Sequence, residues 1–275
     1  MTISRSQLNI VLSAVVFLSA FGILYHDVIR KMISIWLSDD NYSHGFFIPV
    51  VSAYLIWNNY QNLTKAKFAP ANSGLLLLCG SLLFYILANI GAELFSMRFS
   101  MIMVLLSTSV FVFGWFLTRE IFLPVLYLLF MMPFPAIIWD KIAFPLKLFT
   151  TNIAVTVIQL TGIPVYGEGN IIHLSNTTLE VVDACSGLRS LISLLALSAA
   201  FALISDLIKW KKLLLFLSAV PIAVALNIVR LTVTAILAQF YGSQVADGFL
   251  HDISGILVFM IALSLLLLEY RLLTK

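Results

Sequence analysis

Charged residues are scarce in this sequence: they make up 11% of 275 positions, whereas hydrophobic residues make up 61%. A soluble domain of this length does not need so much apolar surface, but a lipid bilayer does, since each spanning helix takes about 20 mostly apolar residues. The Lys and Arg residues are scattered at the ends of apolar runs and form no basic patch, so no nucleic-acid partner is indicated. Composition therefore predicts an integral membrane protein whose first partner is the bilayer.

Cysteines are scarce as well, because the sequence has two of them and no CxxC pair. Two cysteines cannot build a disulfide framework. The sequence also lacks an HExxH motif and any tight Cys/His cluster, so we expect no metal and no cofactor. A convincing small-x-small cleavage site is missing after the first apolar run, and we interpret that run as a retained span rather than a signal peptide.

The apolar runs predict an all-α integral membrane protein with about eight transmembrane helices. These predicted spans cover approximately residues 8–25, 46–60, 73–91, 98–118, 120–138, 186–206, 212–240 and 251–270. The connections are short and no internal repeat is visible. The whole chain, 1–275, is therefore expected to be a single polytopic membrane domain.

The positions of Lys and Arg predict the orientation, because short cytoplasmic loops carry an excess of positive charge. With the N-terminus inside, nine of these residues fall on the inner side and five on the outer side. The firmest anchor is the Lys-Trp-Lys-Lys segment at 209–212, between the sixth and seventh predicted spans. The connections before the sixth and eighth spans are then expected outside.

Two outer connections are large enough to carry function, at about 26–45 and about 139–185. In the second, Asn152, Thr156 and Gln159 share one helical face, which predicts a helix lying in the membrane interface. The segment that follows alternates apolar and polar residues around Gly-Glu-Gly and Ser-Asn breaks. This pattern predicts a short β-hairpin on the outer membrane surface.

Cys185 lies between that hairpin and the sixth span. A membrane cysteine is usually a small buried hydrophobe, and Cys79 in an apolar run fits that interpretation. Cys185 is instead expected at the outer N-terminus of a helix, where backbone N–H groups favour the thiolate. Arg189 is expected one turn deeper, on the same face. The sequence thus offers Cys185 as a nucleophile, with a structural role as the alternative.

Arg230 lies well inside the seventh predicted span, with Asn227 on the same helical face. An arginine at this depth faces a protein interior or a wet cavity, either as a structural residue or as a fixed positive group for an anion. His251 begins the eighth span on the outer side, where a boundary role is the alternative. Because Cys185 and His251 end on one membrane face, and Arg230 can reach toward them, the sequence places a nucleophile, a base and a cation at one level.

His44 and Asp183 are supporting candidates. His44 begins the second span on the outer side, where it is a polar lip or part of a metal site with Asp39, Asp40 and His173. We prefer the polar lip, because no metal-binding motif supports the second interpretation. Asp183 either caps a helix or orients His251, and capping is the preferred interpretation.

Several short motifs follow one another along the chain. They are Asn41-Tyr-Ser-His-Gly45, Met132-Pro-Phe-Pro135, Gly162-Ile-Pro-Val-Tyr-Gly-Glu-Gly-Asn170, Glu180-Val-Val-Asp-Ala-Cys-Ser-Gly-Leu-Arg-Ser190, Asn227-Ile-Val-Arg230 and His251-Asp-Ile-Ser-Gly255. In this order they resemble the motif set of the exosortases, membrane enzymes of the bacterial exosortase/archaeosortase family. The resemblance covers about residues 42–255, which is the exosortase-like core of the chain.

This resemblance implies a protein-sorting enzyme, a cysteine protease or transpeptidase. Its partners would be the C-terminal sorting signals of membrane-anchored secreted proteins, each with a Pro-Glu-Pro motif, a transmembrane helix and a basic tail. Cys185, Arg230 and His251 fall on the proposed catalytic positions of the family, with a thioacyl intermediate on Cys185. Asp183 stands where many members have Glu. The resemblance also implies the bacterial inner membrane, an active site and hairpin facing the periplasm, and an association with exopolysaccharide systems; the acceptor of the acyl group stays open.

Two other functions are consistent with an outward His and Arg. A transporter would use Arg230 to bind an anion at mid-membrane, but the chain shows no inverted repeat. A membrane transferase for lipid-linked exopolysaccharide precursors would suit a diphosphate leaving group, but it leaves Cys185 without a role. Replacing Cys185 separates both alternatives from the cysteine enzyme.

Overall fold

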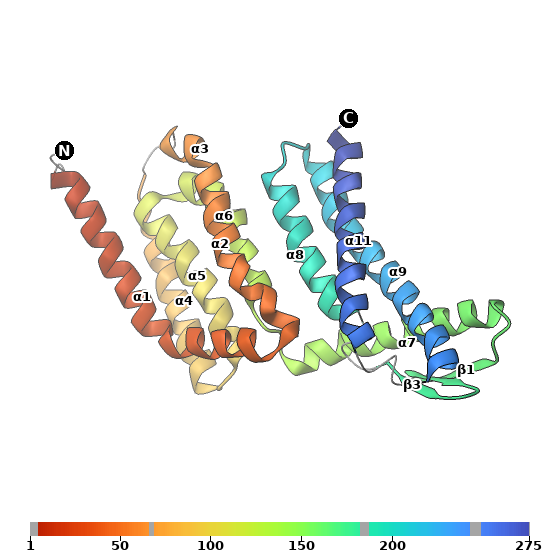
Figure 1. Cartoon of the computed structure of the whole chain (residues 1–275). Helices are drawn as coiled ribbons and strands as arrows, with labels where there is room; N and C mark the ends of the chain where they lie inside the picture. The colour runs from red at the N-terminus through yellow and green to blue at the C-terminus, as the bar shows by residue number, and fades with distance from the viewer. Residues whose placement is uncertain (1–4, 66–68, 182–186, 243–248, 275) are drawn as a thin grey trace.

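The computed structural model describes residues 5–65, 69–181, 187–242 and 249–274. Figure 1 shows two groups of helices side by side, with a crosswise layer at the lower end. The first group contains α1 (Arg5–Ser38), η1 (Asp40–Phe46), α2 (Phe47–Asn58), α3 (Tyr60–Lys65), α4 (Asn72–Ile90), α5 (Leu94–Phe113), α6 (Trp115–Tyr127) and η2 (Leu128–Met131). The remainder contains α7 (Ala136–Leu160), β1 (Val165–Glu168), β2 (Ile171–Leu174), β3 (Thr178–Glu180), α8 (Leu188–Ile204), α9 (Lys209–Tyr241) and α11 (Phe249–Thr274).

The described residues include five helices that are long and apolar enough to cross a membrane. They are Asn72–Ile90, Leu94–Phe113, Ala136–Leu160, Lys209–Tyr241 and Ser254–Thr274. Helix α8 is apolar but shorter, at 17 residues. The chain is therefore a multi-pass, mostly helical membrane protein. The total of about eight spans stays a prediction.

Helix α1 has 34 residues. At about 1.5 Å per residue it is longer than the roughly 30 Å hydrocarbon core of a bilayer. Figure 1 shows that α1 bends, so that its second part runs crosswise near the lower end of the molecule before η1 begins. The predicted outer segment at 26–45 is thus largely helical, and it turns back into the molecule through η1.

The predicted spans at 98–118 and 120–138 have the wrong boundaries. Helix α5 ends at Phe113 because Gly114 adopts φ +87, a left-handed conformation, and its backbone packs directly on the carbonyl of Ala69. Helix α6 therefore begins at Trp115, several residues earlier than predicted, and passes into the short η2. Gly114 therefore sets the boundary between α5 and α6. The apolar residues on both sides of it continue without a break, so hydrophobicity alone did not indicate where α5 ends.

Helix α7 is the helix predicted to lie in the membrane interface. Its length and composition also suit a span, but Figure 1 shows it running across the lower ends of α8, α9 and α11. The three polar residues of its predicted outer face are exposed, whereas Ala154 and Ile158 on the opposite face are fully buried against the sheet and α9. Direction and amphipathic pattern agree, so we describe α7 as a crosswise helix.

The predicted hairpin is part of a three-stranded antiparallel sheet with the order β1-β2-β3. Val165 pairs with Leu174 at one end of β1–β2, and Ile171 pairs with Glu180 in β2–β3. The hairpin prediction was therefore incomplete, since the short third strand was missed. One face of the sheet packs on α7 and α9 around the fully buried Ile172.

The start of α1, helix α3, the α8–α9 connection and the end of α11 lie at one end of the molecule, opposite α7 and the sheet (Figure 1). Lys211 near the start of α9 donates a hydrogen bond to the carbonyl of Leu273 near the end of α11, at 2.5 Å. This arrangement is the one that the predicted topology requires. The two helix groups meet where α2, α6 and η1 pack against α8.

Candidate functional site

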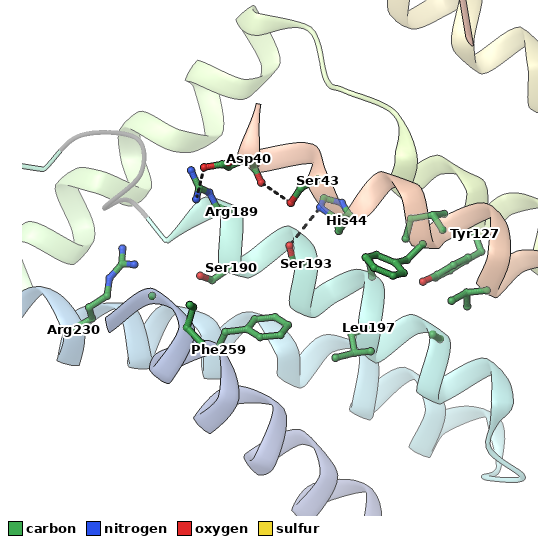
Figure 2. Close-up of a pocket in the computed structure, with 17 residues that line it drawn as sticks. Asp40, Ser43, His44, Tyr127, Arg189, Ser190, Ser193, Leu197, Arg230 and Phe259 are labelled. Carbon is green, nitrogen blue, oxygen red and sulfur yellow. Dashed lines mark hydrogen bonds and ion pairs between the residues drawn. The ribbon is translucent and has the colours of Figure 1, made fainter. Parts of the chain in front are cut away.

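A cavity of about 860 Å³ lies where the two helix groups meet. Its wall comes from six elements of the chain. The lining residues are Asp40, Ser43, His44, Phe47, Ile48, Val51, Tyr127, Arg189, Ser190, Ser193, Ala196, Leu197, Ala200, Arg230, Gly255, Ile256 and Phe259. Figure 2 shows Arg189 and Arg230 at one end of the cavity and Leu197 and Tyr127 toward the other. The cavity therefore has a cationic end at the level of the helix starts and a mainly apolar continuation along α8.

Arg230 enters the cavity from the middle part of α9. Its residue is 9% exposed, and Asn227 one turn earlier is 2% exposed. Gly255 of α11 lies directly beside it, because a Cβ atom built on Gly255 would be 3.7 Å from Nη1 of Arg230. The sequence-based prediction that Arg230 faces a protein-lined cavity is thereby confirmed. A guanidinium held in such a low-dielectric wall interacts strongly with negative charge.

Gly187 fixes how α8 begins. It adopts φ +79 just before Leu188, and a Cβ atom there would lie 2.5 Å from Cγ of Asn227. Only glycine meets both requirements without strain, since left-handed backbone is costly for other residues. The start of α8 therefore rests on the Asn227 side chain, one turn of α9 before Arg230.

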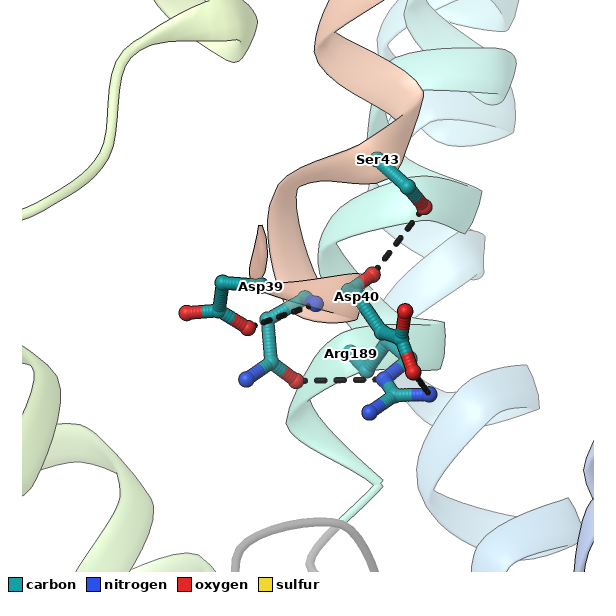
Figure 3. A network of polar contacts seen from close by, with 5 residues as sticks. Asp39, Asp40, Ser43 and Arg189 are labelled. Carbon is teal, nitrogen blue, oxygen red and sulfur yellow. Dashed lines mark hydrogen bonds and ion pairs between the residues drawn. The ribbon is translucent and has the colours of Figure 1, made fainter. Parts of the chain in front are cut away.

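Arg189 is held by η1, as Figure 3 shows. Its Nη1 lies 3.5 Å from a carboxylate oxygen of Asp40, and its Nε donates to Oδ1 of Asn41 at 3.2 Å. Asp39 caps η1 by accepting a hydrogen bond from the Asn41 backbone N–H at 2.9 Å. The guanidinium is partly exposed, so the ion pair itself contributes little stability. Its clearer effect is to offset the charge of Arg189 at the mouth of the cavity.

His44 joins three elements on the cavity wall. Its Nε2 donates to the Phe130 carbonyl at 3.2 Å, because a carbonyl can only accept. The other ring nitrogen then accepts from Ser193 Oγ at 3.4 Å. Burial lowers the pKa of His44 below its usual 6.5, because the charged ring loses hydration in the protein. His44 thus ties η1 to η2 and α8, which is more than the polar lip that its position predicted.

The remaining predicted site residues are placed only in part. Cys185 and Asp183 lie outside the described residues. His251 is in the first turn of α11, one turn before Gly255, and its side chain is outside the described part. Helix α8 begins at Leu188, directly after Gly187 with φ +79, and the expectation that Arg189 lies one helical turn below Cys185 stays a prediction.

Arg98 is a buried cation, and it is one of the five Lys and Arg residues that the sequence predicts on the outer side. Its residue is 4% exposed, and its Nη1 donates to the Pro133 carbonyl at 3.0 Å. The Tyr42 hydroxyl accepts a hydrogen bond from the backbone N–H of Phe134 at 3.3 Å, in the same segment. Arg98 and Tyr42 therefore hold the segment after η2 against η1. The sequence did contain a signal for this burial, because Arg98, like Arg230, is surrounded by mostly apolar residues.

Within the described part of the chain, no group of three or more His, Cys, Asp or Glu side chains is arranged to hold a metal ion. His44 and His173, which a metal site would have brought together, are apart: His173 stacks on Tyr166 and lies 3.4 Å from Glu168 on the sheet. What the described residues do bring together is a buried guanidinium, two neighbouring helix starts and an apolar cavity. Such a site can bind and polarise a carbonyl or an anionic group.

The comparisons with known proteins give one match. The family model described as transmembrane exosortase (Exosortase_EpsH) matches residues 36–268 of the chain. Among curated proteins and among solved structures, no match was found. The matched region begins near the end of α1 and runs almost to the end of α11, so it contains every element that lines the cavity.

Proposed function

Because the chain belongs to the transmembrane exosortase family, we propose that it cleaves membrane-anchored secreted proteins, or transfers them to an acceptor, through a cysteine at the outer membrane surface. The observation that carries the proposal is the meeting of three motif-bearing segments at one end of one cavity. Gly187 rests on Asn227, and Gly255 rests on Arg230. The starts of α8 and α11, which are far apart in the sequence, thus both lie close to the Asn227–Arg230 part of α9, and Cys185 and His251 are two and four positions before Gly187 and Gly255 in the sequence.

In the proposed reaction the Cys185 thiolate attacks a peptide carbonyl of the substrate, with His251 taking the thiol proton. The tetrahedral intermediate collapses, the C–N bond breaks, and His251 returns the proton to the departing amine. The substrate is then held as a thioester on Cys185. Water or the amine of an acceptor attacks this thioester and releases the thiol.

Arg230 is proposed to stabilise the negative charge that develops on the carbonyl oxygen. Its residue is buried, so the guanidinium is fixed before the reaction and needs little reorganisation. Arg189 is less suited to this role because its side chain is partly exposed, so water screens its charge more than that of the buried Arg230. We therefore assign Arg230 to the reaction, and Arg189, Asn227 and His44 to the support of the site.

The cavity also supports a membrane-anchored substrate. Its volume of about 860 Å³ falls within the roughly 300–1,000 Å³ typical of binding sites. Its apolar continuation along α8 suits the beginning of a transmembrane segment, while the cationic end lies at the level of the proposed chemistry. The substrate class, a C-terminal Pro-Glu-Pro motif followed by an apolar helix and a basic tail, belongs to this proposal and comes from the family.

We further propose that residues 1–275 form one polytopic domain of about eight spans in the bacterial inner membrane. In this topology α7, the sheet and the cationic end of the cavity face the periplasm. The clustering of Lys209, Lys211 and Lys212 at the opposite end of the molecule supports this orientation.

The decisive experiment replaces Cys185 by Ala and follows cleavage of a co-expressed protein from the same genome that carries such a sorting signal. We expect no cleavage, with unchanged amounts of the enzyme in the membrane. Cys79→Ala is the matched control, because Cys79 is an exposed residue on α4, and it should cleave like the unmodified enzyme. Full cleavage by Cys185→Ala would exclude the cysteine mechanism, and a lack of cleavage by the unmodified enzyme would favour a transferase or transporter.

A further inference from the structure

The small sheet has two edge strands, and helix α7 occupies only one of them. At the β1 edge, the Val165 carbonyl accepts a hydrogen bond from the side chain of Gln159 on α7, at 3.1 Å. Gly167 in the same strand packs closely on α7, since a Cβ atom there would lie 3.2 Å from Val155. At this edge the Val165 carbonyl therefore already has a partner, and α7 lies beside the strand.

The β3 edge is different. Val181 N–H donates to the Asn170 carbonyl at 2.8 Å, and Leu174 N–H donates to the Thr177 carbonyl at 2.9 Å. Hydrogen-bonded and non-hydrogen-bonded pairs alternate in an antiparallel ladder, so the backbone groups of Thr178 and Glu180 point away from β2. Both residues are exposed. Within the described residues, these outward groups have no hydrogen-bond partner, and β2 is the one element that packs extensively on β3.

This open edge is connected to the proposed nucleophile by a very short length of chain. Val181, directly after β3, is fully buried, and its carbonyl accepts a second bond from Nδ2 of Asn170 at 3.3 Å. Cys185 follows Glu180 by five positions. At about 3.3–3.6 Å per residue the chain can place them at most roughly 18 Å apart. An extended peptide on β3 would therefore pass within a few residues of Cys185.

We propose that the outer edge of β3, formed by Thr178 and Glu180, binds the extended segment of the substrate that precedes its membrane helix, as a fourth strand of the sheet. This inference rests on the proposed function. Backbone pairing supplies affinity without reading side chains, which suits an enzyme that accepts many proteins carrying one short signal. The charged Glu180 and the shortness of the strand would at the same time discourage pairing between two copies of the enzyme.

The test uses two variants that differ in one backbone donor. Glu180→Pro removes the outward N–H and keeps the bonds of Leu179 and Val181 to β2, whereas Glu180→Ala removes the same side chain and keeps the N–H. The substrate is a synthetic peptide with a Pro-Glu-Pro segment, an apolar helix and an Arg cluster, in detergent. We expect kcat/KM for Glu180→Pro to be about tenfold lower than for Glu180→Ala, mainly through a higher KM. Equal values for the two variants would overturn the proposal.

A second measurement does not depend on how the proline variant folds. In the inactive Cys185→Ala enzyme, a photoreactive amino acid replaces Thr178 or, as the matched control, Tyr166 on the opposite edge strand. We expect the peptide to crosslink at position 178 and not at 166. Equal crosslinking at both positions, or crosslinks between two enzyme molecules only, would contradict the proposal.

The two proposals fail in different ways. If Cys185→Ala still cleaves the peptide, the proposed function itself is wrong. If cleavage requires Cys185 but is insensitive to the N–H of residue 180, and position 178 gives no peptide adduct, only the strand-addition inference is wrong.

Discussion

Three arginines, Arg98, Arg189 and Arg230, have different environments, although they look alike in the sequence. Arg98 is buried and bonded to the Pro133 carbonyl. Arg189 is partly exposed and engaged by Asp40 and Asn41. Arg230 is buried in the cavity wall beside Gly255. The three residues share a positive charge, but burial and hydrogen-bond partners determine what each guanidinium can do.

Replacing arginine by lysine at two of these positions separates their roles. Lysine keeps the charge but loses the planar fork of donors. At the buried Arg230, we expect Arg230→Lys to lower turnover of the sorting-signal substrate by about 100-fold or more, as for the loss of an oriented oxyanion donor. At the partly exposed Arg189, we expect Arg189→Lys to stay within about tenfold of the unmodified enzyme.

Both variants are compared at equal amounts of enzyme in the membrane, and alkylation of Cys185 by a small reagent is measured beside cleavage. Arg230→Lys should alkylate normally, since its proposed role concerns the substrate carbonyl. If instead Arg189→Lys is the inactive variant and Arg230→Lys is active, the two assignments are reversed.

His44 should make stability depend on pH. Burial lowers its pKa below 6.5 in the folded protein, so at mildly acidic pH the unfolded chain binds a proton that the folded chain does not. Its contribution is fully present above about pH 6.5 and is lost as the pH falls from there to the lower pKa of the folded state. We expect the thermal midpoint of the detergent-solubilised protein to fall between pH 7 and pH 5, and less so in His44→Gln.

The control for His44 is His26→Gln. His26 is an exposed residue of α1 beside Asp27, and its replacement should leave the pH profile of the unmodified protein in place. Parallel profiles for His44→Gln and the unmodified protein would show that the His44 ring is free to take up a proton in the folded state.

The contact between the start of α8 and the Asn227 side chain of α9 depends on Gly187. Gly187 combines a left-handed φ of +79 with a close approach to the Asn227 side chain. Gly187→Ala should therefore destabilise the protein by more than the about 1–2 kcal/mol that the backbone conformation alone costs, and it should displace Asn227. We expect a lower thermal midpoint together with reduced cleavage.

Gly162→Ala separates the two effects, because Gly162 has nearly the same φ, +81, with nothing within 4 Å of a built Cβ. It should show the backbone cost alone and retain cleavage. If the two variants were equally stable, close packing of Gly187 on Asn227 would not be important for the start of α8.

Over the whole molecule, the strongest prediction concerns which end faces outward. In a background without Cys79 and Cys185, Ser175→Cys in the connection between β2 and β3 should react with a membrane-impermeant thiol reagent applied from outside. Lys209→Cys at the start of α9 should react only after the membrane is opened. Both residues are exposed, so access to the reagent and not burial decides the result. The reverse pattern would invert the topology and place the proposed site in the cytoplasm.

Much of the architecture could be predicted from the sequence, because a bilayer imposes strong and local requirements. The order of the apolar helices, the crosswise α7 with its polar face, and a β structure before the sixth span all follow from periodicity and composition. The burial of Arg230 could be inferred in the same way, since an unprotected charge at that depth is costly. Each of these properties depends on residues that are neighbours along the chain.

The tertiary structure decided everything that depends on contacts between distant segments. The burial of Arg98 arises only when α5 packs beside the segment after η2, and the pairing of Arg189 with η1 and the contact between His44 and Ser193 arise only when the two helix groups meet. Within the described residues, the β1 edge of the sheet is bonded by Gln159 of α7, whereas β2 is the element that packs extensively on β3. Hydrophobic periodicity determines which elements form and which face is apolar, but partners for polar groups are selected by packing geometry, which no single segment contains.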